Sequence, residues 1–187
     1  MFNSNNPALI IIDVQDAIDS FSDFERNNLD AEVKISNLLA NWRKKKLPVI
    51  HVRHSSKFTK SPYHISSPLV NFKADVAPLE SECVITKQEN CAFIETELEQ
   101  ILQHNGVSEL IICGVLTNHS VDVSVRVAAA LGFKVFVPSD ATAAYGMKLL
   151  NGKVLSALDT HQFTLSVLSG EYCTLVTSGQ LIASNSD

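Results

Sequence analysis

Three polar residues, Asp13, Lys87 and Ser120, each follow a short apolar run at well-separated points of the chain. A carboxylate can exchange protons, a lysine beside it can orient it and favour a neighbouring anion, and a hydroxyl can attack a carbonyl carbon. Each residue is unremarkable alone, because such residues also cap helices, face solvent or bond to nearby backbone. Their chemistry depends on whether the fold brings them together.

The segment around Ser120 has the pattern of a buried strand, a turn and a helix. Residues 110–113 are apolar, Gly114 follows them, and a helix-compatible run extends over residues 118–131. Ser120 is therefore expected in the first turn of a helix, where free backbone N–H groups and the helix dipole favour an anion or an activated nucleophile.

Leu116, Thr117 and His119 fall in the turn before this predicted helix. Thr117 and Asn118 are the better candidates for its N-cap, which leaves the hydroxyl of Ser120 free to point elsewhere. For His119, two roles stay open: a contact with substrate or a solvent-facing position in the first turn.

Short apolar runs alternate with longer amphipathic runs along the chain. Strands are predicted at residues 8–12, 49–52, 84–86, 110–113, 134–137 and 173–176. Helices are predicted at residues 29–46, 96–105 (opened by a capping box of Thr96 and Glu99), 118–131 and 154–168. This alternation predicts an α/β fold with a parallel sheet covered on both faces.

Asp13, Lys87 and Ser120 lie at or just after the carboxyl ends of three different predicted strands. Ligands of open α/β sheets bind outside those ends, because right-handed crossovers bring them to one edge. The sequence therefore predicts that the three residues meet in one cleft. Gln15 and His54 are further candidates for the pocket, which a Ser- and His-rich loop over residues 54–78 is expected to shape.

Composition narrows the class of protein. The chain has 187 residues, 45% of them hydrophobic, which is enough for a substantial core and predicts one domain over residues 1–187. A net charge of −5 gives no general attraction for nucleic acid or anionic membranes. We expect a cytoplasmic protein that acts on a small molecule, because no signal peptide, membrane-length apolar run or paired cysteine spacing is present.

Neither a metal nor a nucleotide cofactor is indicated. The spacings of His51, His54 and His64 match no standard zinc pattern, and the glycines form no dinucleotide- or phosphate-binding motif. We therefore expect no cofactor and no protein-bound metal.

Four motifs in order make the chain resemble the isochorismatase-like hydrolases, the cysteine hydrolase superfamily that includes nicotinamidases and other small-amide hydrolases. They are ALIIIDVQ at residues 8–15, Lys87 with Ala92-Phe93 after it, GVLTxxSV at residues 114–121, and GFKV at residues 132–135 leading to Asp140-Ala141. Together they span most of the chain.

The resemblance implies a three-layer α/β/α fold with a six-stranded parallel sheet and a catalytic triad of aspartate, lysine and cysteine. Asp13, Lys87 and Ser120 occupy the three positions. It also implies a cis peptide bond between Val115 and Leu116, and a homo-oligomer, dimer or tetramer, whose interface closes the site. Backbone N–H groups of residues 116–120 would then stabilise an oxyanion.

Two departures from the family stand out: Ser120 replaces the family cysteine, and the nicotinamidase metal signature is absent. Ser120 has three explanations: an introduced change, a natural variant with lost or altered activity, or isochorismatase chemistry on a vinyl ether, which needs no nucleophile. We expect a hydrolase of small-molecule C–N bonds that is nearly inactive in this Ser120 form. The alternatives are a vinyl-ether hydrolase and a non-catalytic ligand-binding homologue.

Overall fold

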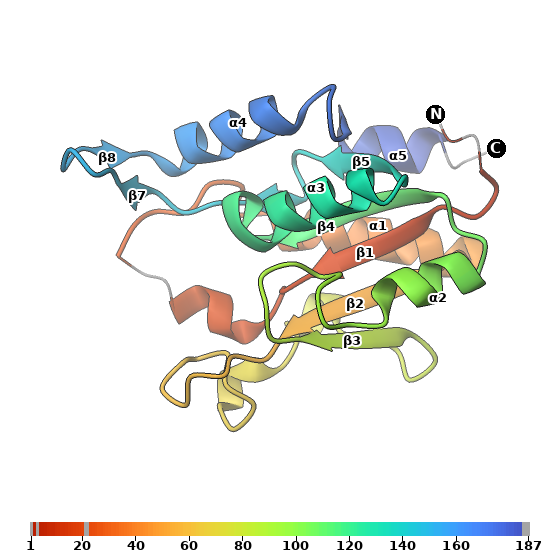
Figure 1. Cartoon of the computed structure of the whole chain (residues 1–187), viewed down its shortest axis with the longest axis horizontal. Coiled ribbons are helices and arrows are strands. Elements are labelled where there is room, and N and C mark those ends of the chain that lie inside the picture. Colours follow the sequence, from red (N-terminus) through yellow and green to blue (C-terminus); the bar gives the residue numbers. More distant parts are fainter. Residues whose placement is uncertain (1, 3, 21–22, 185–187) are drawn as a thin grey trace.

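A computed structural model describes residues 2, 4–20 and 23–184 of the chain. Its central feature is a parallel sheet with the strand order β3-β2-β1-β4-β5-β9 (Figure 1). These six strands are β1 (Ala8–Ile12), β2 (Val49–His54), β3 (Cys83–Lys87), β4 (Glu109–Val115), β5 (Lys134–Pro138) and β9 (Thr174–Val176). The predicted α/β fold with a parallel sheet is confirmed.

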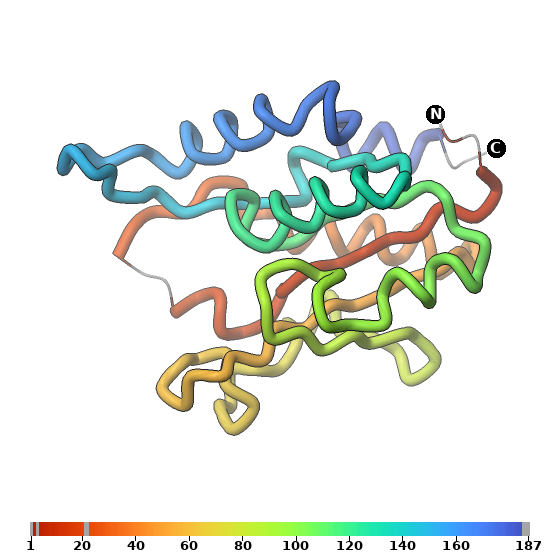
Figure 2. The backbone as a smooth tube through the Cα atoms, viewed as in Figure 1, coloured from red at the N-terminus to blue at the C-terminus, as the bar shows by residue number. Residues whose placement is uncertain are grey.

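Three short strands lie outside this order. The two-residue strand β6 (Thr142–Ala143) pairs with the end of β4. Strands β7 (Met147–Lys148) and β8 (Val154–Leu155) form a separate antiparallel hairpin, which projects from one end of the molecule (Figure 2). The main sheet is therefore extended by one pairing beyond the six predicted strands.

Helices cover both faces of the sheet. They are α1 (Ala31–Lys45), α2 (Leu98–His104), α3 (Asp122–Ala130), α4 (Ala157–Leu168) and α5 (Ser178–Ser184). Leu9 and Ile11 of β1 pack in one core with α1 and α5, whereas Ile10 and Ile12 pack in the other with α2, α3 and α4. Because successive strand residues face opposite sides, the uninterrupted aliphatic run of β1 is buried in both layers.

The strand order reverses beside β1, which places a crevice at a defined point of the sheet. From β1 the chain builds outward through β2 and β3 on one side, and through β4, β5 and β9 on the other. In such sheets, the crevice outside the carboxyl ends of the two central strands is the usual ligand site. Asp13 follows β1 and Ser120 lies shortly after β4.

Gly114 lets the two central strands approach each other at those ends. It is in register with Ile12, its φ is +117°, and a Cβ atom there would lie 2.1 Å from the Ile12 carbonyl oxygen. A side chain at this position would clash with the backbone of Ile12, and it would also be strained by the positive φ angle. The next peptide bond but one, between Val115 and Leu116, is cis, as the resemblance implied.

Two predicted helix starts are wrong. Helix α2 begins at Leu98 without the predicted capping box: the Thr96 hydroxyl donates to the Ala92 carbonyl oxygen at 2.6 Å and accepts from the Leu98 N–H at 3.4 Å, and Glu99 bonds to Gln103. The last predicted helix was extended to Val154, which instead lies in β8. Helix α4 starts after Ser156, whose hydroxyl oxygen accepts from the Asp159 N–H at 3.0 Å.

The helix predicted at residues 29–46 is α1, shorter by two residues at its start and one at its end. Across the described residues, the structure has no helix that is both long and apolar enough to cross a membrane.

Substitution of Gly114 by alanine should destabilise the fold more than the same change at another positive-φ glycine. We expect Gly114→Ala to lower the free energy of unfolding by more than about 3 kcal/mol, because it adds a clash with backbone to the conformational strain. Gly106→Ala is the matched control: φ is +63° and no atom lies within 4 Å of its added Cβ, so about 1 to 2 kcal/mol is expected. Equal losses in urea denaturation would contradict the close-approach argument.

Candidate active site

The Lys87 ammonium connects the three predicted catalytic residues. Its Nζ atom donates to Asp13 Oδ2 at 2.7 Å, to Ser120 Oγ at 3.1 Å and to the Glu89 carbonyl oxygen at 3.2 Å. Lys87 is 1% exposed, and Asp13 and Ser120 are each 5% exposed. The structure thus brings Lys87 together with Asp13, which lies 74 positions earlier in the chain, and with Ser120, which lies 33 positions later.

Parallel pairing explains how Lys87 reaches Asp13. Lys87 is the last residue of β3, in register with His54 of β2, and β2 separates β3 from β1. The long lysine stem therefore extends across the end of β2. The Asp13 N–H donates to the Val52 carbonyl oxygen at 2.9 Å and the φ angle of Asp13 is 54°, so the chain turns as soon as β1 ends.

Ser120 lies in a π-helical turn, Thr117–Val121, that precedes α3. The Leu116 carbonyl oxygen accepts from the N–H groups of His119 at 3.1 Å and Val121 at 3.2 Å. No side chain caps this turn, so the predicted cap by Thr117 or Asn118 is wrong. The predicted helix over residues 118–131 is thus divided between the π turn and α3.

The Thr117 hydroxyl anchors the turn to other elements instead. It bonds to Thr142 Oγ1 and to His161 Nδ1, each at 2.9 Å. His161 Nε2 lies 3.0 Å from the Ser139 carbonyl oxygen, to which it donates, so Nδ1 accepts from Thr117. Burial lowers the pKa of His161, which keeps the ring neutral. His161 is thus a buried, hydrogen-bonded histidine that holds the turn, a contact that no pattern in the sequence indicated.

A cavity of about 540 Å³ opens above Asp13 and Ser120. His54, predicted for the pocket, lines it together with Leu116 and His119 of the turn, whereas Thr117 does not. The other lining residues are Ile18, Ser20, Asp23, Phe24, Ser61, Tyr63, Asn90, Val115, Asn118, Tyr145, Gly146 and Met147. Ser61 and Tyr63 lie in the loop that was expected to shape the pocket, and Val115 and Asn118 lie in the GVLTxxSV motif. The remaining residues, among them Ile18, Asp23, Phe24 and Tyr145, belong to no motif, so reasoning from spacing did not find them.

Gln15 is not one of the lining residues, contrary to expectation. Its side-chain nitrogen donates to the carbonyl oxygens of His54 at 3.1 Å and Val70 at 2.7 Å, and its side-chain oxygen accepts from the His54 N–H at 2.8 Å. The amide is occupied by backbone and is fully buried. Gln15 therefore fastens the loop after β2 to the segment after β1.

The electrostatics of the cavity wall favour a neutral His54. Burial lowers the pKa of its imidazole, and the Lys87 ammonium lowers it further, against the opposing effects of Asp13 and Glu89. The His54 ring lies edge to face with Tyr63, with 5.6 Å between ring centroids. Burial also raises the pKa of the Tyr63 phenol, so both rings are uncharged near neutral pH.

No cysteine takes the place of Ser120. Cys113 is fully buried in β4, its Sγ donates to the Ile10 carbonyl oxygen at 3.6 Å, and burial raises the pKa of its thiol. Cys83, Cys91 and Cys173 are not among the residues lining the cavity. Within the described part of the chain, no group of three His, Cys, Asp or Glu side chains is placed to hold a metal ion.

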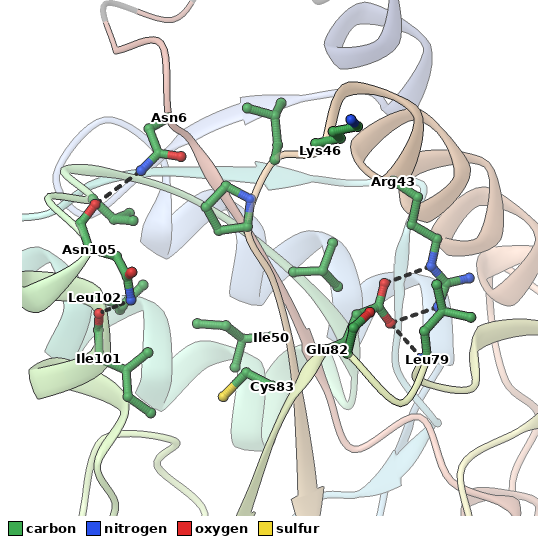
Figure 3. Close-up of a pocket in the computed structure, with 15 residues that line it drawn as sticks. Asn6, Arg43, Lys46, Ile50, Leu79, Glu82, Cys83, Ile101, Leu102 and Asn105 are labelled. Carbon is green, nitrogen blue, oxygen red and sulfur yellow. Dashed lines mark hydrogen bonds and ion pairs between the residues drawn. The ribbon is translucent and has the colours of Figure 1, made fainter.

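A second cavity, of about 550 Å³, lies at the amino ends of β2 and β3, away from the triad (Figure 3). Arg43 forms two hydrogen bonds to the Glu82 carboxylate, at 2.7 and 2.8 Å, and His51 Nε2 lies 3.0 Å from the same group. Burial alone would raise the pKa of Glu82, but hydrogen bonds from Arg43, the Leu79 N–H and His51 outweigh it and hold the pKa at about 2. This network ties the segment before β3 to α1 and β2.

Comparison with known proteins shows to which family this chain belongs. Residues 7–177 match the isochorismatase domain family. The chain belongs to that family. It is 40% identical over 175 residues to the isochorismatase family protein YrdC of Bacillus subtilis, covering 94% of each chain. It is also similar to a crystal structure of an isochorismatase-family protein from Chromobacterium violaceum, with a TM-score of 0.96, 40% identity and coverage of 98% of this chain and 95% of that one.

A relative with a named activity is more distant. Nicotinamidase 3 of Arabidopsis thaliana is 29% identical over 163 residues, which is 79% of this chain and 78% of that protein. The chain is therefore a member of a hydrolase family.

Removing both partners of the buried ion pair should cost less stability than the sum of the two separate removals. We expect Lys87→Met to lower the free energy of unfolding by about 3 to 5 kcal/mol, because Asp13 would keep a buried charge without its cation. The double variant Asp13→Asn with Lys87→Met should lose less than the sum of the two single losses. Lys57→Met, which breaks an exposed pair with Glu89, is the control and should change little. Additive losses in urea melts would contradict the coupling.

The Glu82 network should make the free energy of unfolding depend on pH in the acidic range. Because the folded pKa of Glu82, about 2, lies below its ordinary 4.5, the ionised carboxylate stabilises the fold above pH 4.5. That contribution is lost as pH falls from about 4.5 toward 2. Unfolding of Glu82→Gln should therefore show a flatter dependence on pH in this window, whereas the exposed Glu80→Gln should follow the parent. Parallel curves for Glu82→Gln and the parent would refute this assignment.

Proposed function

We propose that this protein is a hydrolase of small-molecule amide bonds whose machinery is the family triad with a serine at the nucleophile position. The observation that carries the proposal is the Lys87 ammonium, which touches Asp13 and Ser120 at once beside an open cavity. A buried cation between a carboxylate and a nucleophile is the arrangement that favours an anionic attacking atom. The family membership and the nicotinamidase relative support the same reaction class.

The proton path follows from this geometry. Asp13 takes the proton of the residue at position 120 as that residue attacks the carbonyl carbon, and a tetrahedral oxyanion forms. N–H groups of residues 116–120 stabilise the oxyanion, each contributing about 3 kcal/mol. The His119 N–H is already bonded to Leu116 in the free protein, so the other N–H groups of the turn take this role.

Collapse of the tetrahedral intermediate breaks the C–N bond. Asp13 returns its proton to the departing nitrogen, and an acyl group remains on residue 120. Water then attacks the acyl carbon while Asp13 accepts its proton; the bond between the acyl carbon and residue 120 breaks, Asp13 passes the proton to the departing atom of residue 120, and the carboxylic acid is released. Lys87 keeps its hydrogen bonds to Asp13 and residue 120 throughout, which positions both.

The hydroxyl of Ser120 limits the rate. A serine is essentially un-ionised at pH 7, whereas a cysteine carries a few per cent thiolate, and Asp13 is a weak base toward an alcohol. The chain with Ser120 should therefore bind a substrate and turn it over very slowly.

A vinyl-ether hydrolase is the second candidate, and one observation favours it. Asp13 Oδ1 is buried and has no hydrogen-bond partner, so it is free to transfer a proton without a nucleophile. In that case Asp13→Asn abolishes isochorismate cleavage, and Ser120→Ala leaves it largely intact. A purely ligand-binding homologue shows no turnover with either residue at position 120.

Restoring the thiol should restore turnover. We expect Ser120→Cys to hydrolyse at least one member of a panel of small primary amides, measured by ammonia release, at a rate 10²-fold or more above the parent, an order of magnitude typical of one catalytic group. Ser120→Cys combined with Asp13→Asn is the matched control and should be silent. Comparable turnover by the serine form would refute the expected impairment, and silence of both forms on amides together with isochorismate cleavage would replace the amide proposal.

A further inference from the structure

Three buried hydrogen-bonding atoms at the catalytic cavity have no partner. They are Asp13 Oδ1, His54 Nδ1 and Asn118 Oδ1. All three residues line the same cavity. A buried polar atom without a partner is costly, and in a binding site it indicates a group that a ligand supplies.

All three atoms can accept a hydrogen bond. An ionised carboxylate and an amide oxygen can only accept hydrogen bonds. Burial and the Lys87 ammonium lower the pKa of His54, so its ring is neutral, and the unpartnered Nδ1 accepts when Nε2 carries the proton. A complementary ligand must therefore bring several N–H or O–H donors.

The charges around the cavity are one-sided. Among the described residues that line it, Asp13 and Asp23 carry charge and none is a lysine or arginine. The nearby Lys87 ammonium already has three acceptors, Asp13, Glu89 and Ser120. An anionic ligand would place its oxygens against acceptors and carboxylates with no cation to receive them.

Aromatic rings complete the wall. Phe24, Tyr63 and Tyr145 line the cavity, and the Tyr145 hydroxyl donates to the Ile18 carbonyl oxygen at 3.0 Å. Rings of this kind attract organic cations and tolerate neutral apolar groups. The unpartnered acceptors, the negative charge and the aromatic rings thus all favour a neutral or cationic ligand that carries hydrogen-bond donors.

We propose that the substrate of this site is a neutral or positively charged amide with further N–H donors, and that anionic amides are excluded. The proposal rests on the amide hydrolysis argued above and names its substrate class. It also runs against isochorismate, which is a dicarboxylate. Asn118 and Asp23 are the specificity-determining residues: Asn118 accepts a hydrogen bond from the substrate, and Asp23 selects its charge at the mouth.

Three amides of matched length test the charge selection through binding alone. β-Alaninamide, butanamide and succinamate share the primary amide and end in an ammonium, a methyl and a carboxylate. We expect NMR titration of the Ser120 protein at pH 7 and constant ionic strength to give a dissociation constant for β-alaninamide roughly tenfold lower than for succinamate, with butanamide between them. Succinamate binding as tightly as β-alaninamide would overturn the proposal.

Variants assign the preference to the cavity. Asp23→Asn should reduce the ratio of β-alaninamide to succinamate affinity by roughly two- to fivefold, as for a partly solvated charge pair. Asp75→Asn removes the same charge from an exposed site away from the cavity and should leave the ratio unchanged. Asn118→Leu should weaken β-alaninamide roughly fivefold while changing butanamide less. An equal effect of Asp75→Asn and Asp23→Asn would assign the preference to net charge and overturn the local assignment.

This experiment separates the two proposals. Charge-selective binding without turnover of any amide by Ser120→Cys supports the selectivity and removes the amidase function. Turnover of all three amides with similar dissociation constants supports the amidase and removes the selectivity.

Discussion

The ammonium of Lys87 is a cation taken out of water, and the architecture around it follows from that constraint. Burying a charge is tolerated only where its hydrogen bonds are all made and an opposite charge is close. Lys87 meets both conditions with Asp13 at 2.7 Å, Ser120 at 3.1 Å and the Glu89 carbonyl at 3.2 Å. The positions of β1, β3 and the turn after β4 are therefore fixed relative to one another at the site where chemistry is proposed.

Several contacts around the ion pair serve to hold those elements. Gly114 allows β1 and β4 to meet where Asp13 emerges, since any side chain there would strike the Ile12 carbonyl. His161 and Thr117 fasten the π turn that carries Ser120, and Gln15 fastens the loop that carries His54. The catalytic geometry thus depends on buried polar contacts between segments far apart in the chain, in which each segment supplies the hydrogen-bond partner of the other.

Strands, their parallel arrangement and the meeting of Asp13, Lys87 and Ser120 could be predicted because they depend on apolar patterning and on a general property of parallel sheets. Contacts with distant partners could not. The Gln15 amide bonds to backbone 39 and 55 positions away, and the Thr117 hydroxyl bonds to His161 and Thr142 instead of capping the turn. At Thr96 the predicted capping box failed for a different reason, because the hydroxyl donates to the carbonyl oxygen of Ala92 four positions back, which is itself a local contact.

The most direct test of the Lys87-centred unit is the pKa of a thiol placed at position 120. In Ser120→Cys, the rate of iodoacetamide alkylation at this position, followed by peptide mass spectrometry as a function of pH, reports that pKa without any substrate. The account predicts a value well below the ordinary about 8.5 of a free cysteine, and a return toward or above it when Lys87→Met is added. An ordinary pKa that is indifferent to Lys87→Met would show that the ammonium does not activate residue 120, and would contradict the account.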